Sequence, residues 1–238
     1  MTSFLPIPNE ARLVSVAEMQ AIEKAADAAG HAYATMMELA GQAVANFVLD
    51  RAQASSTLNS APLLILVGPG NNGGDGYVAA RILKQRGWPV WCETLCPTAA
   101  LKGDAAEAFR RWTGKTLPIS RDNPMAELFI DALFGAGLSR PLEGEAARLA
   151  EASERMRDRV VAVDVPSGIH GDTGLALGGV AFRAALTVTF ARRKPGHLLL
   201  PGRACAGDIV LADIAMPETA ILRALDGAPE TLAIAGGF

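Results

Sequence analysis

Cysteine is scarce in this sequence, and a long apolar run is missing altogether. The three cysteines, Cys92, Cys96 and Cys205, are odd in number and show no paired C-x-x-C spacing. This argues against a disulfide framework and a thiolate metal site, and it indicates a reduced, intracellular protein. Because no run of about 18 apolar residues occurs, no segment is expected to span a membrane.

A secretory leader and a large basic patch are missing as well. The N-terminal MTSFLPIPNEARL has no apolar stretch behind a basic start, so it does not resemble a signal peptide. The net charge is −3, from 22 basic and 25 acidic residues, which argues against nucleic acid as the main partner. We expect a cytoplasmic protein with neither a nucleic-acid nor a membrane partner.

The sequence is instead rich in apolar runs that alternate with helical segments. Strands are expected at 63–67, 89–95, 128–133, 160–165, 186–191 and 208–214, and helices at 16–30, 34–52, 76–86, 100–112 and 143–156. Ser15 and Glu18 form a capping-box pattern at the first helix. Continuous apolar strands between helices predict an α/β fold, with a mainly parallel sheet covered on both faces. We expect one domain over 1–238, of which 218–238 forms a loose tail or linker.

Four unusual motifs each lie at the end of a predicted strand. They are GPGNNGGDG from Gly68, DALFGAGLSRP from Asp131, VDVPSG from Val163 and ARRKPG from Ala191. In an open parallel sheet, ligands bind beyond the carboxyl ends of the strands, which meet at one edge. The four loops are therefore predicted to converge on one site.

The first motif combines glycines with two asparagines and an aspartate. The residues are Gly70, Asn71, Asn72, Gly73, Gly74 and Asp75. The glycines allow the backbone to approach a ligand closely, and the following helix offers free N–H groups to an anion. A carboxylate beside a phosphate is repulsive, so this is no plain dinucleotide turn. Asp75 either caps a helix that starts at Gly76 or contributes to a binding site.

Two further carboxylates, Asp131 and Asp164, end strands that are otherwise almost entirely apolar. A buried carboxylate needs a cation, N–H groups or a substrate hydroxyl as partner. Asn72, Asp131 and Ser167 together would supply hard oxygen ligands, which suit an alkali or alkaline-earth cation and not zinc. The alternative is that Asp131 and Asp164 only organise the loops.

Other polar residues give weaker signals. The three histidines are scattered, at His31, His170 and His197. No Ser/His/Asp order of a hydrolytic triad can be recognised, and Ser167 lacks the G-x-S-x-G elbow of such enzymes. The absence of a G-x-x-x-x-G-K-[ST] motif argues against a P-loop kinase or ATPase. The basic cluster that ends at Lys194 is either a solvated turn or an anion contact with an acid–base lysine.

A conventional nucleotide-binding oxidoreductase is the main rival. Gly68, Gly70 and Gly73 have the strand-then-helix context of a dinucleotide fingerprint, and Glu93 lies where a ribose-binding acid belongs. This interpretation leaves Asn71, Asn72, Asp75, Asp131 and the PSG loop without roles.

Together, GPGNNGGDGYVAARIL, DALFGAGLSRP, VVAVDVPSGIHGDTG and LTVTFARRKPGHLLLPGR resemble the NAD(P)H-hydrate epimerase family of the YjeF N-terminal type. The resemblance covers roughly 12–217 and includes MMELAGQAV. It implies a three-layer αβα Rossmann-like sandwich that interconverts R and S forms of NADHX and NADPHX, nicotinamide cofactors hydrated at C6. A partner dehydratase repairs one epimer, and in some proteins it is fused to this domain.

The resemblance also implies the site residues and a potassium ion. The potassium ligands would be Asn72, Asp131 and Ser167, with carbonyls of the 135–141 loop. The substrate would contact Asn71, Asn72, Gly73, Gly74, Asp75, Gly135, Ala136, Gly137, Leu138, Ser139, Arg140, Pro141 and Asp164. Loss and re-addition of the C6 hydroxyl through an iminium ion needs an acid and a base, for which Asp164 is the first candidate and Lys194 the second. Ring opening to an aldehyde has the same needs.

Two positions depart from the family pattern. Leu39 stands where the family commonly has Asn, and Ala136 stands where it often has Thr. Neither change touches the expected ligands or Asp164. Domains of this fold also serve as non-catalytic dimerisation modules, which have no need to keep several carboxylates together. A homodimer is implied only by the resemblance.

Overall fold

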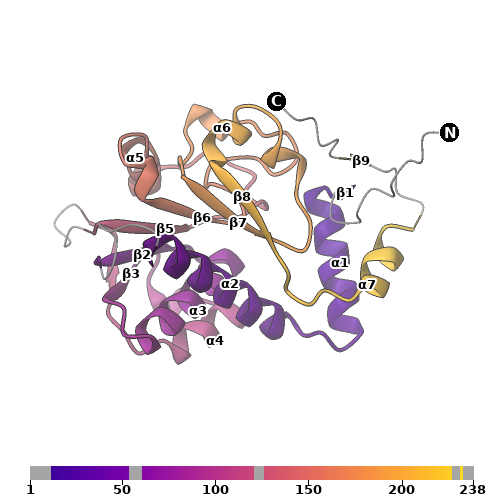
Figure 1. Ribbon diagram of the computed structural model, residues 1–238, viewed down its shortest axis with the longest axis horizontal. Coiled ribbons are helices and arrows are strands. Elements are labelled where there is room, and N and C mark those ends of the chain that lie inside the picture. The colour runs from indigo at the N-terminus through magenta and orange to yellow at the C-terminus, as the bar shows by residue number, and fades with distance from the viewer. Residues whose placement is uncertain (1–11, 54–60, 121–125, 227–230, 233–238) are drawn as a thin grey trace.

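The computed structural model describes residues 12–53, 61–120, 126–226 and 231–232 (Figure 1). Its centre is a seven-stranded sheet, entirely parallel, in the order β4-β3-β2-β5-β6-β7-β8. These strands are β2 (Leu63–Val67), β3 (Val90–Thr94), β4 (Thr116–Pro118), β5 (Leu128–Ala132), β6 (Val160–Val163), β7 (Leu186–Phe190) and β8 (Asp208–Ala212). The predicted α/β fold with a parallel sheet is confirmed, and all six expected strands are present.

Helices cover both faces of this sheet and form the two outer layers of a three-layer sandwich (Figure 1). The helices are α1 (Val16–Ala28), α2 (Tyr33–Gln53), α3 (Asn71–Gln85), α4 (Gly103–Arg111), α5 (Gly144–Ser153), α6 (Gly202–Ala206) and α7 (Glu218–Ala224). Figure 1 shows α2, α3 and α4 on one face, and α5 and α6 on the other. Within the described residues, no helix is long and apolar enough to cross a membrane.

The strands are continuously apolar because both of their faces are buried. In β2, Leu63, Ile65 and Val67 pack into the larger core beneath α2 and α3, while Leu64 and Leu66 pack into the core that includes α5. Successive side chains of a strand point to opposite faces, so a strand between two helical layers needs apolar residues at every position.

The order of the strands reverses at β2. The chain moves from β2 to β3 and β4 on one side, and then returns to place β5 on the other side of β2. Such a reversal opens a crevice beyond the carboxyl ends of the two central strands. The loops after Val67 and Ala132 border this crevice.

A smaller layer lies beside the sandwich. Helix α1 packs against α7, and β1 (Arg12–Leu13) pairs with β9 (Thr231–Leu232) in an antiparallel arrangement (Figure 1). The capping box of α1 is confirmed, because the Ser15 hydroxyl accepts from the Glu18 N–H and the Glu18 carboxylate accepts from the Ser15 N–H.

Three local features differ from the sequence-based expectation. Helix α3 begins at Asn71, not at Gly76, with Gly70 as its N-cap, so Asp75 is an interior helical residue and the proposed capping role is wrong. Strand β4 was not expected. At the start of the expected loose tail, residues 218–224 form α7, because Ala220 and Ile221 bury apolar surface in the core shared with α1. Most of 227–238 lies outside the described residues.

Candidate active site

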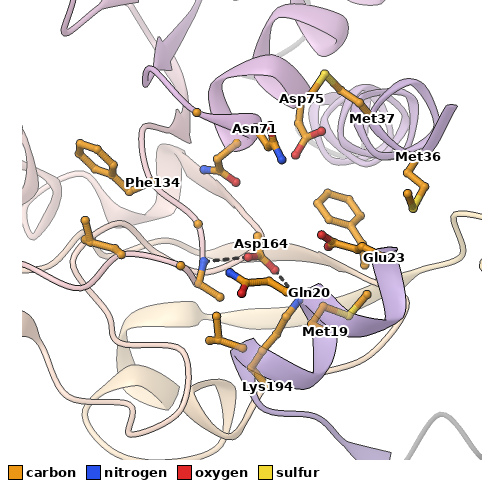
Figure 2. A pocket seen from close by; sticks show the side chains of 18 of the residues that line it. Met19, Gln20, Glu23, Met36, Met37, Asn71, Asp75, Phe134, Asp164 and Lys194 are labelled. Atoms are coloured by element: carbon orange, nitrogen blue, oxygen red, sulfur yellow. Dashed lines mark hydrogen bonds and ion pairs between the residues drawn. The ribbon is translucent and has the colours of Figure 1, made fainter. Parts of the chain in front are cut away.

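The loops predicted to converge do form the walls of one cavity of about 470 Å³, at the carboxyl edge of the sheet (Figure 2). Of the expected substrate and catalytic residues, the cavity is lined by Asn71, Asn72, Asp75, Gly135, Ala136, Gly137, Leu138, Ser139, Arg140, Asp164 and Lys194. Gly73, Gly74 and Pro141 are not among the lining residues. A wall that the sequence did not predict comes from α1 and α2, through Met19, Gln20, Glu23, Tyr33, Met36 and Met37.

The glycines of the first motif allow protein segments to pack closely. A Cβ on Gly68 would overlap the Leu133 carbonyl oxygen, and a Cβ on Gly73 would overlap the Gly68 carbonyl oxygen. A Cβ on Gly74 would lie 2.5 Å from the Met37 methyl group. These glycines therefore bring the first turn of α3 against the ends of β2 and β5 and against α2, which carries Asn71, Asn72 and Asp75 to the cavity.

The Asp164 carboxylate is held on the cavity floor by three groups. Its Oδ1 accepts from Lys194 Nζ at 2.7 Å and from Thr189 Oγ1 at 3.1 Å, and its Oδ2 accepts from the Ala136 N–H at 2.8 Å. The backbone of Asp164 has a left-handed φ of 65°, which is uncommon outside glycine and frequent at functional sites. Burial alone would raise the pKa of Asp164, but Lys194 and the hydrogen bonds lower it to about 2. The carboxylate is therefore ionised at neutral pH and forms a largely buried ion pair with Lys194.

His197 supports this ion pair from behind. Its Nε2 donates to the Asp164 carbonyl oxygen at 2.7 Å, and its Nδ1 accepts from the Lys194 N–H at 2.9 Å. These two bonds require the neutral ring with its proton on Nε2. Burial, together with the Lys194 charge, lowers the pKa of His197 to about 4, while the Asp164 charge opposes the shift. Through these two bonds, His197 holds the main chain of both Asp164 and Lys194 in place.

Two more carboxyl groups, Asp75 of α3 and Glu23 of α1, face the same cavity (Figure 2). Burial raises the pKa of Asp75 well above its usual range, helped by the charges of Asp164 and Glu23 and opposed by Lys194. Burial also raises the pKa of Glu23, with Lys194 opposing. The cavity thus combines one ionised carboxylate with two carboxyl groups that hold protons more strongly than usual.

Asp131 and Ser167 meet behind the cavity wall. The Asp131 carboxylate, fully buried, accepts from Ser167 Oγ at 2.6 Å, from the Ser167 N–H at 2.8 Å and from the Leu133 N–H at 3.3 Å. Ser167 Oγ also lies 3.0 Å from the Phe134 carbonyl oxygen. Burial raises the pKa of Asp131 to about 6 in spite of these hydrogen bonds. Both residues organise the loops, and the carboxylate has no cationic side chain among these partners.

The third expected ligand, Asn72, is placed differently. A Cβ on Gly135 would lie 3.1 Å from Asn72 Oδ1 and 2.9 Å from Asp164 Oδ2, so the amide lies near Asp164. Its Nδ2 is buried without a hydrogen-bond partner among the described residues. No described group of three His, Cys, Asp or Glu side chains could hold a metal ion. The donors present, one carboxylate with hydroxyl, amide and carbonyl oxygens, fit a weakly charged hard cation and not zinc.

The basic cluster after β7 is not a solvated turn. Lys194 is buried in the site, and Arg192 is buried with hydrogen bonds to the Ala191 carbonyl and to Glu218. The Arg193 carbonyl accepts from the Val14 N–H at 3.0 Å and so anchors the segment before α1.

Glu93 does not take the position that the oxidoreductase interpretation needs. It is buried in β3, accepts a hydrogen bond from Trp91 Nε1 at 3.3 Å and does not line the cavity. Leu39, one of the two departures from the family pattern, packs against the core of α2 away from the cavity. At Ala136 the contact to Asp164 comes from the backbone N–H, so the missing threonine hydroxyl does not affect it.

Sequence reasoning missed Glu23, Thr189 and His197. A signal for Glu23 exists, because it follows Met19 by four residues and so interrupts the apolar stripe of α1 with a charge. His197 follows Lys194 by three residues in a Pro-Gly turn, which is a weak signal. Nothing local distinguishes Thr189, since a buried threonine is ordinary in a strand.

Comparison with known proteins identifies the family and the fold. Residues 33–196 match the family described as YjeF-related protein N-terminus. An NAD(P)H-hydrate epimerase of Rhodobacter capsulatus is 40% identical over 193 residues, covering 77% of this chain and 90% of that protein. A crystal structure of a yeast protein aligns with a TM-score of 0.66 at 23% identity, covers 79% of this chain and 83% of that one, and shares the fold.

Some relatives are longer. A bifunctional NAD(P)H-hydrate repair enzyme Nnr of Thermofilum pendens is 35% identical over 221 residues, which cover 87% of this chain but 41% of that enzyme. The chain thus spans less than half the length of the bifunctional relatives it matches. It belongs to the YjeF-related N-terminal family, together with the NAD(P)H-hydrate epimerases that it matches over most of their length.

Proposed function

We propose that this domain is an NAD(P)H-hydrate epimerase, an isomerase that interconverts the R and S forms of NADHX and NADPHX. Relatives of similar length that bear this name are 37–40% identical. The observation that carries the proposal is the buried Asp164–Lys194 ion pair on the floor of a cavity at the sheet's switch point. The cavity is large enough for the hydrated nicotinamide ring with its ribose.

The ion pair supplies an acid and a base to one face of the ring. Loss of the C6 hydroxyl as water requires a proton on its oxygen, and leaves an iminium ion between N1 and C6. Re-addition of water requires a base. Lys194 donates the proton and Asp164 accepts it on the return, while the carboxylates of the cavity stabilise the positive charge on the ring. Ring opening to an aldehyde would use the same two groups.

A potassium ion is the cation proposed for the buried oxygen cluster. Asp131, Ser167 and Asn72 would hold it, with loop carbonyl oxygens, after a modest shift of the Asn72 amide. The support is that Asp131 is fully buried and, among the described residues, is hydrogen-bonded by Ser167 and Leu133 with no cationic side chain beside it. When bound, the ion supplies a positive charge that stabilises the ionised Asp131 and fixes the loops around the cavity.

The dehydratase that uses the product is the proposed functional partner. In relatives named as bifunctional repair enzymes, a domain like this one is part of a longer chain. We also propose that the protein forms a homodimer and is located in the cytoplasm.

The test is direct conversion of one epimer. Purified protein is incubated with the R epimer of NADHX, with potassium chloride or with choline chloride, and the S epimer is followed by chromatography. We expect S to form well above the spontaneous rate, and faster with potassium. A folded protein that binds the substrate without accelerating its conversion would refute the epimerase assignment and favour a non-catalytic dimerisation module.

A further inference from the structure

The proposed reaction places a demand on both faces of the substrate ring. In the R and S epimers the hydroxyl group lies on opposite faces at C6. When water leaves from one face and returns to the other, each face needs its own group to give and take a proton. An ion pair fixed on one side of the ring serves only that side.

Asp164 and Lys194 are fixed in this way. They lie together on the cavity floor, where hydrogen bonds from Thr189 and Ala136 prevent the Asp164 carboxylate from turning. Figure 2 shows Asp75 on the far side of the open space from this pair, with Glu23 at the side wall. The two groups come from α3 and α1, which are separate elements from the strand ends that carry the floor.

Asp75 and Glu23 differ from Asp164 in having free oxygen atoms. Among the residues that the structure describes, neither carboxyl group takes part in a hydrogen bond or an ion pair. Both are partly buried and line the cavity. Beside them, the Asn72 amide, more than nine-tenths buried, has an unsatisfied Nδ2. Unpartnered polar groups at three points of one cavity indicate that a polar ligand completes them.

We propose that Asp75 gives and takes the proton at the face of the substrate ring opposite the Asp164–Lys194 pair, and that Glu23 assists it from the side wall of the cavity. The proposal rests on the proposed epimerase function and assigns a role to Glu23, which lies outside the segment matched by the family model.

The electrostatics of the cavity favour a proton on Asp75. The charged groups facing Asp75 are Asp164, Glu23 and Lys194, and the first two make its ionisation unfavourable. Glu23 faces the favourable charge of Lys194, and burial works against its ionisation. Asp75 therefore keeps its proton to a higher pH than an exposed aspartate does. One further acidic residue, Asp104, and one basic residue, Arg140, also line this cavity.

The proton steps balance on each face. Asp75 gives its proton to the C6 hydroxyl of one epimer; the C6–O bond breaks, water leaves, and the nitrogen lone pair forms the N1=C6 bond of the iminium ion. A water molecule on the opposite face then attacks C6, the electrons return to N1, and Asp164 takes the proton of the new hydroxyl. The reverse direction uses the same groups in reverse order, and no oxidant or reductant is needed.

The closing experiment uses the full chain and its Asp75→Asn and Glu23→Gln variants. Epimerisation and uptake of oxygen from [18O]water into the C6 hydroxyl are measured separately, by chromatography and mass spectrometry. In the wild type both epimers should gain label while they interconvert. In Asp75→Asn, one epimer should still exchange its oxygen through the floor pair, while kcat for inversion falls at least ~100-fold, within the usual range for an acid–base group. The spontaneous rate is subtracted throughout.

Glu23→Gln should lower kcat by about tenfold or more, with KM changed less than about threefold. The double variant should be no worse than Asp75→Asn alone, because Glu23 acts through Asp75 and its loss adds nothing once Asp75 is gone. Asp27→Asn, an exposed acid of α1 that does not line the cavity, is the matched control and should stay within twofold of the wild type. Folding of each variant is checked by thermal melting.

Several results would overturn the proposal. Exchange and inversion that fall together in Asp75→Asn would mean that one set of groups serves both faces. Unchanged inversion in both variants, additive losses in the double variant, or wild-type epimerisation without 18O uptake would each refute it too. If a variant fails to fold, the wild-type pH profile decides: kcat should fall as rising pH removes the proton of Asp75, and a flat profile from about pH 5 to pH 9 would refute its role. Absence of wild-type epimerisation, by contrast, would refute the proposed function itself.

Discussion

The His197 imidazole donates a hydrogen bond of 2.7 Å to the main-chain carbonyl of Asp164, a residue with a φ of 65°. An uncommon backbone conformation persists when its surroundings hold it in place. Here the Asp164 N–H donates to the Val188 carbonyl at 2.8 Å, and His197 fixes the other side. The carboxylate is therefore aimed into the cavity by the backbone, before any substrate arrives.

Protonation of His197 should destabilise the fold. The pKa of His197 is lowered from 6.5 to about 4, so between these values the unfolded chain binds a proton that the native protein does not. The contribution of neutral His197 to the free energy of unfolding is complete above pH 6.5. It is lost as pH falls towards 4, at up to about 1.4 kcal/mol per pH unit. In urea unfolding, the stability of the wild type relative to His197→Gln should therefore decrease as pH falls from 6.5 towards 4.

Asp131 contributes a pH dependence of stability over an overlapping pH range, and it runs in the opposite direction to that of His197. The pKa of Asp131 is raised to about 6, so its contribution to stability is present below its unfolded pKa and is lost as pH rises through 6. Because Asp131 is unchanged in His197→Gln, the difference between the two proteins isolates the histidine. A difference that does not vary with pH would contradict the assignment.

Loss of Lys194 should leave Asp164 as an unpaired buried charge. We expect Lys194→Met to lower kcat/KM at least ~100-fold and the free energy of unfolding by on the order of 3 kcal/mol. The Asp164→Asn/Lys194→Met double variant should be more stable than Lys194→Met, because it has no unpaired charge. Lys24→Met, an exposed lysine of α1, is the control for loss of one positive charge. Equal stability of the single and double variants would show that the pair is not coupled.

A methyl group at position 135 should disturb the site without unfolding the protein. A Cβ there would lie 2.9 Å from Asp164 Oδ2 and 3.1 Å from Asn72 Oδ1, so both side chains must move. Gly135→Ala should therefore lower kcat/KM by ~10-fold or more, with little change in melting temperature. A Cβ on Gly137 of the same loop meets nothing within 4 Å, and Gly137→Ala should have a clearly smaller effect. The reverse order would contradict the described geometry of this loop.

The oxygen cluster around Asp131 should respond to potassium in the absence of substrate. An ion that binds only the native state raises its stability in proportion to the logarithm of its concentration. Thermal melting in potassium chloride and in choline chloride of equal ionic strength should differ by several degrees for the wild type, but not for Asp131→Asn. Asp50→Asn, an exposed aspartate of α2, should keep the wild-type response. A potassium effect that survives in Asp131→Asn would place the ion elsewhere.

The fold was largely predictable because the information was local. Each central strand is a continuous apolar run between helices, and such a run has few alternatives in a sheet covered on both faces. Strand β4 was not predicted because Thr116–Pro118 is only three residues long and ends in proline. The start of α3 was misplaced because consecutive glycines are poor helix formers. Packing against the strand ends and α2 nevertheless fixes a helix there from Asn71.

The site was predictable only where it is built from strand ends. Asp164, Lys194 and the 135–140 loop followed from the rule that ligands bind beyond the carboxyl edge. Glu23 did not, because the position of α1 depends on contacts with Asp172, Arg193 and α7, which are far away in the sequence. A contact between distant segments leaves no periodic trace in either of them.

The same contacts determine when the catalytic cavity is completed during synthesis. Helix α1 is made first, yet the groups that hold it emerge from the ribosome last: Asp172 accepts from the Val16 N–H, the Ile214 carbonyl bonds His31, and α7 packs alongside. The full set of contacts that holds the wall carrying Glu23 is therefore available only once residue 224 has been translated. A nascent chain would hold the floor of the cavity before its side wall, and so would acquire the sandwich before it acquires a closed site.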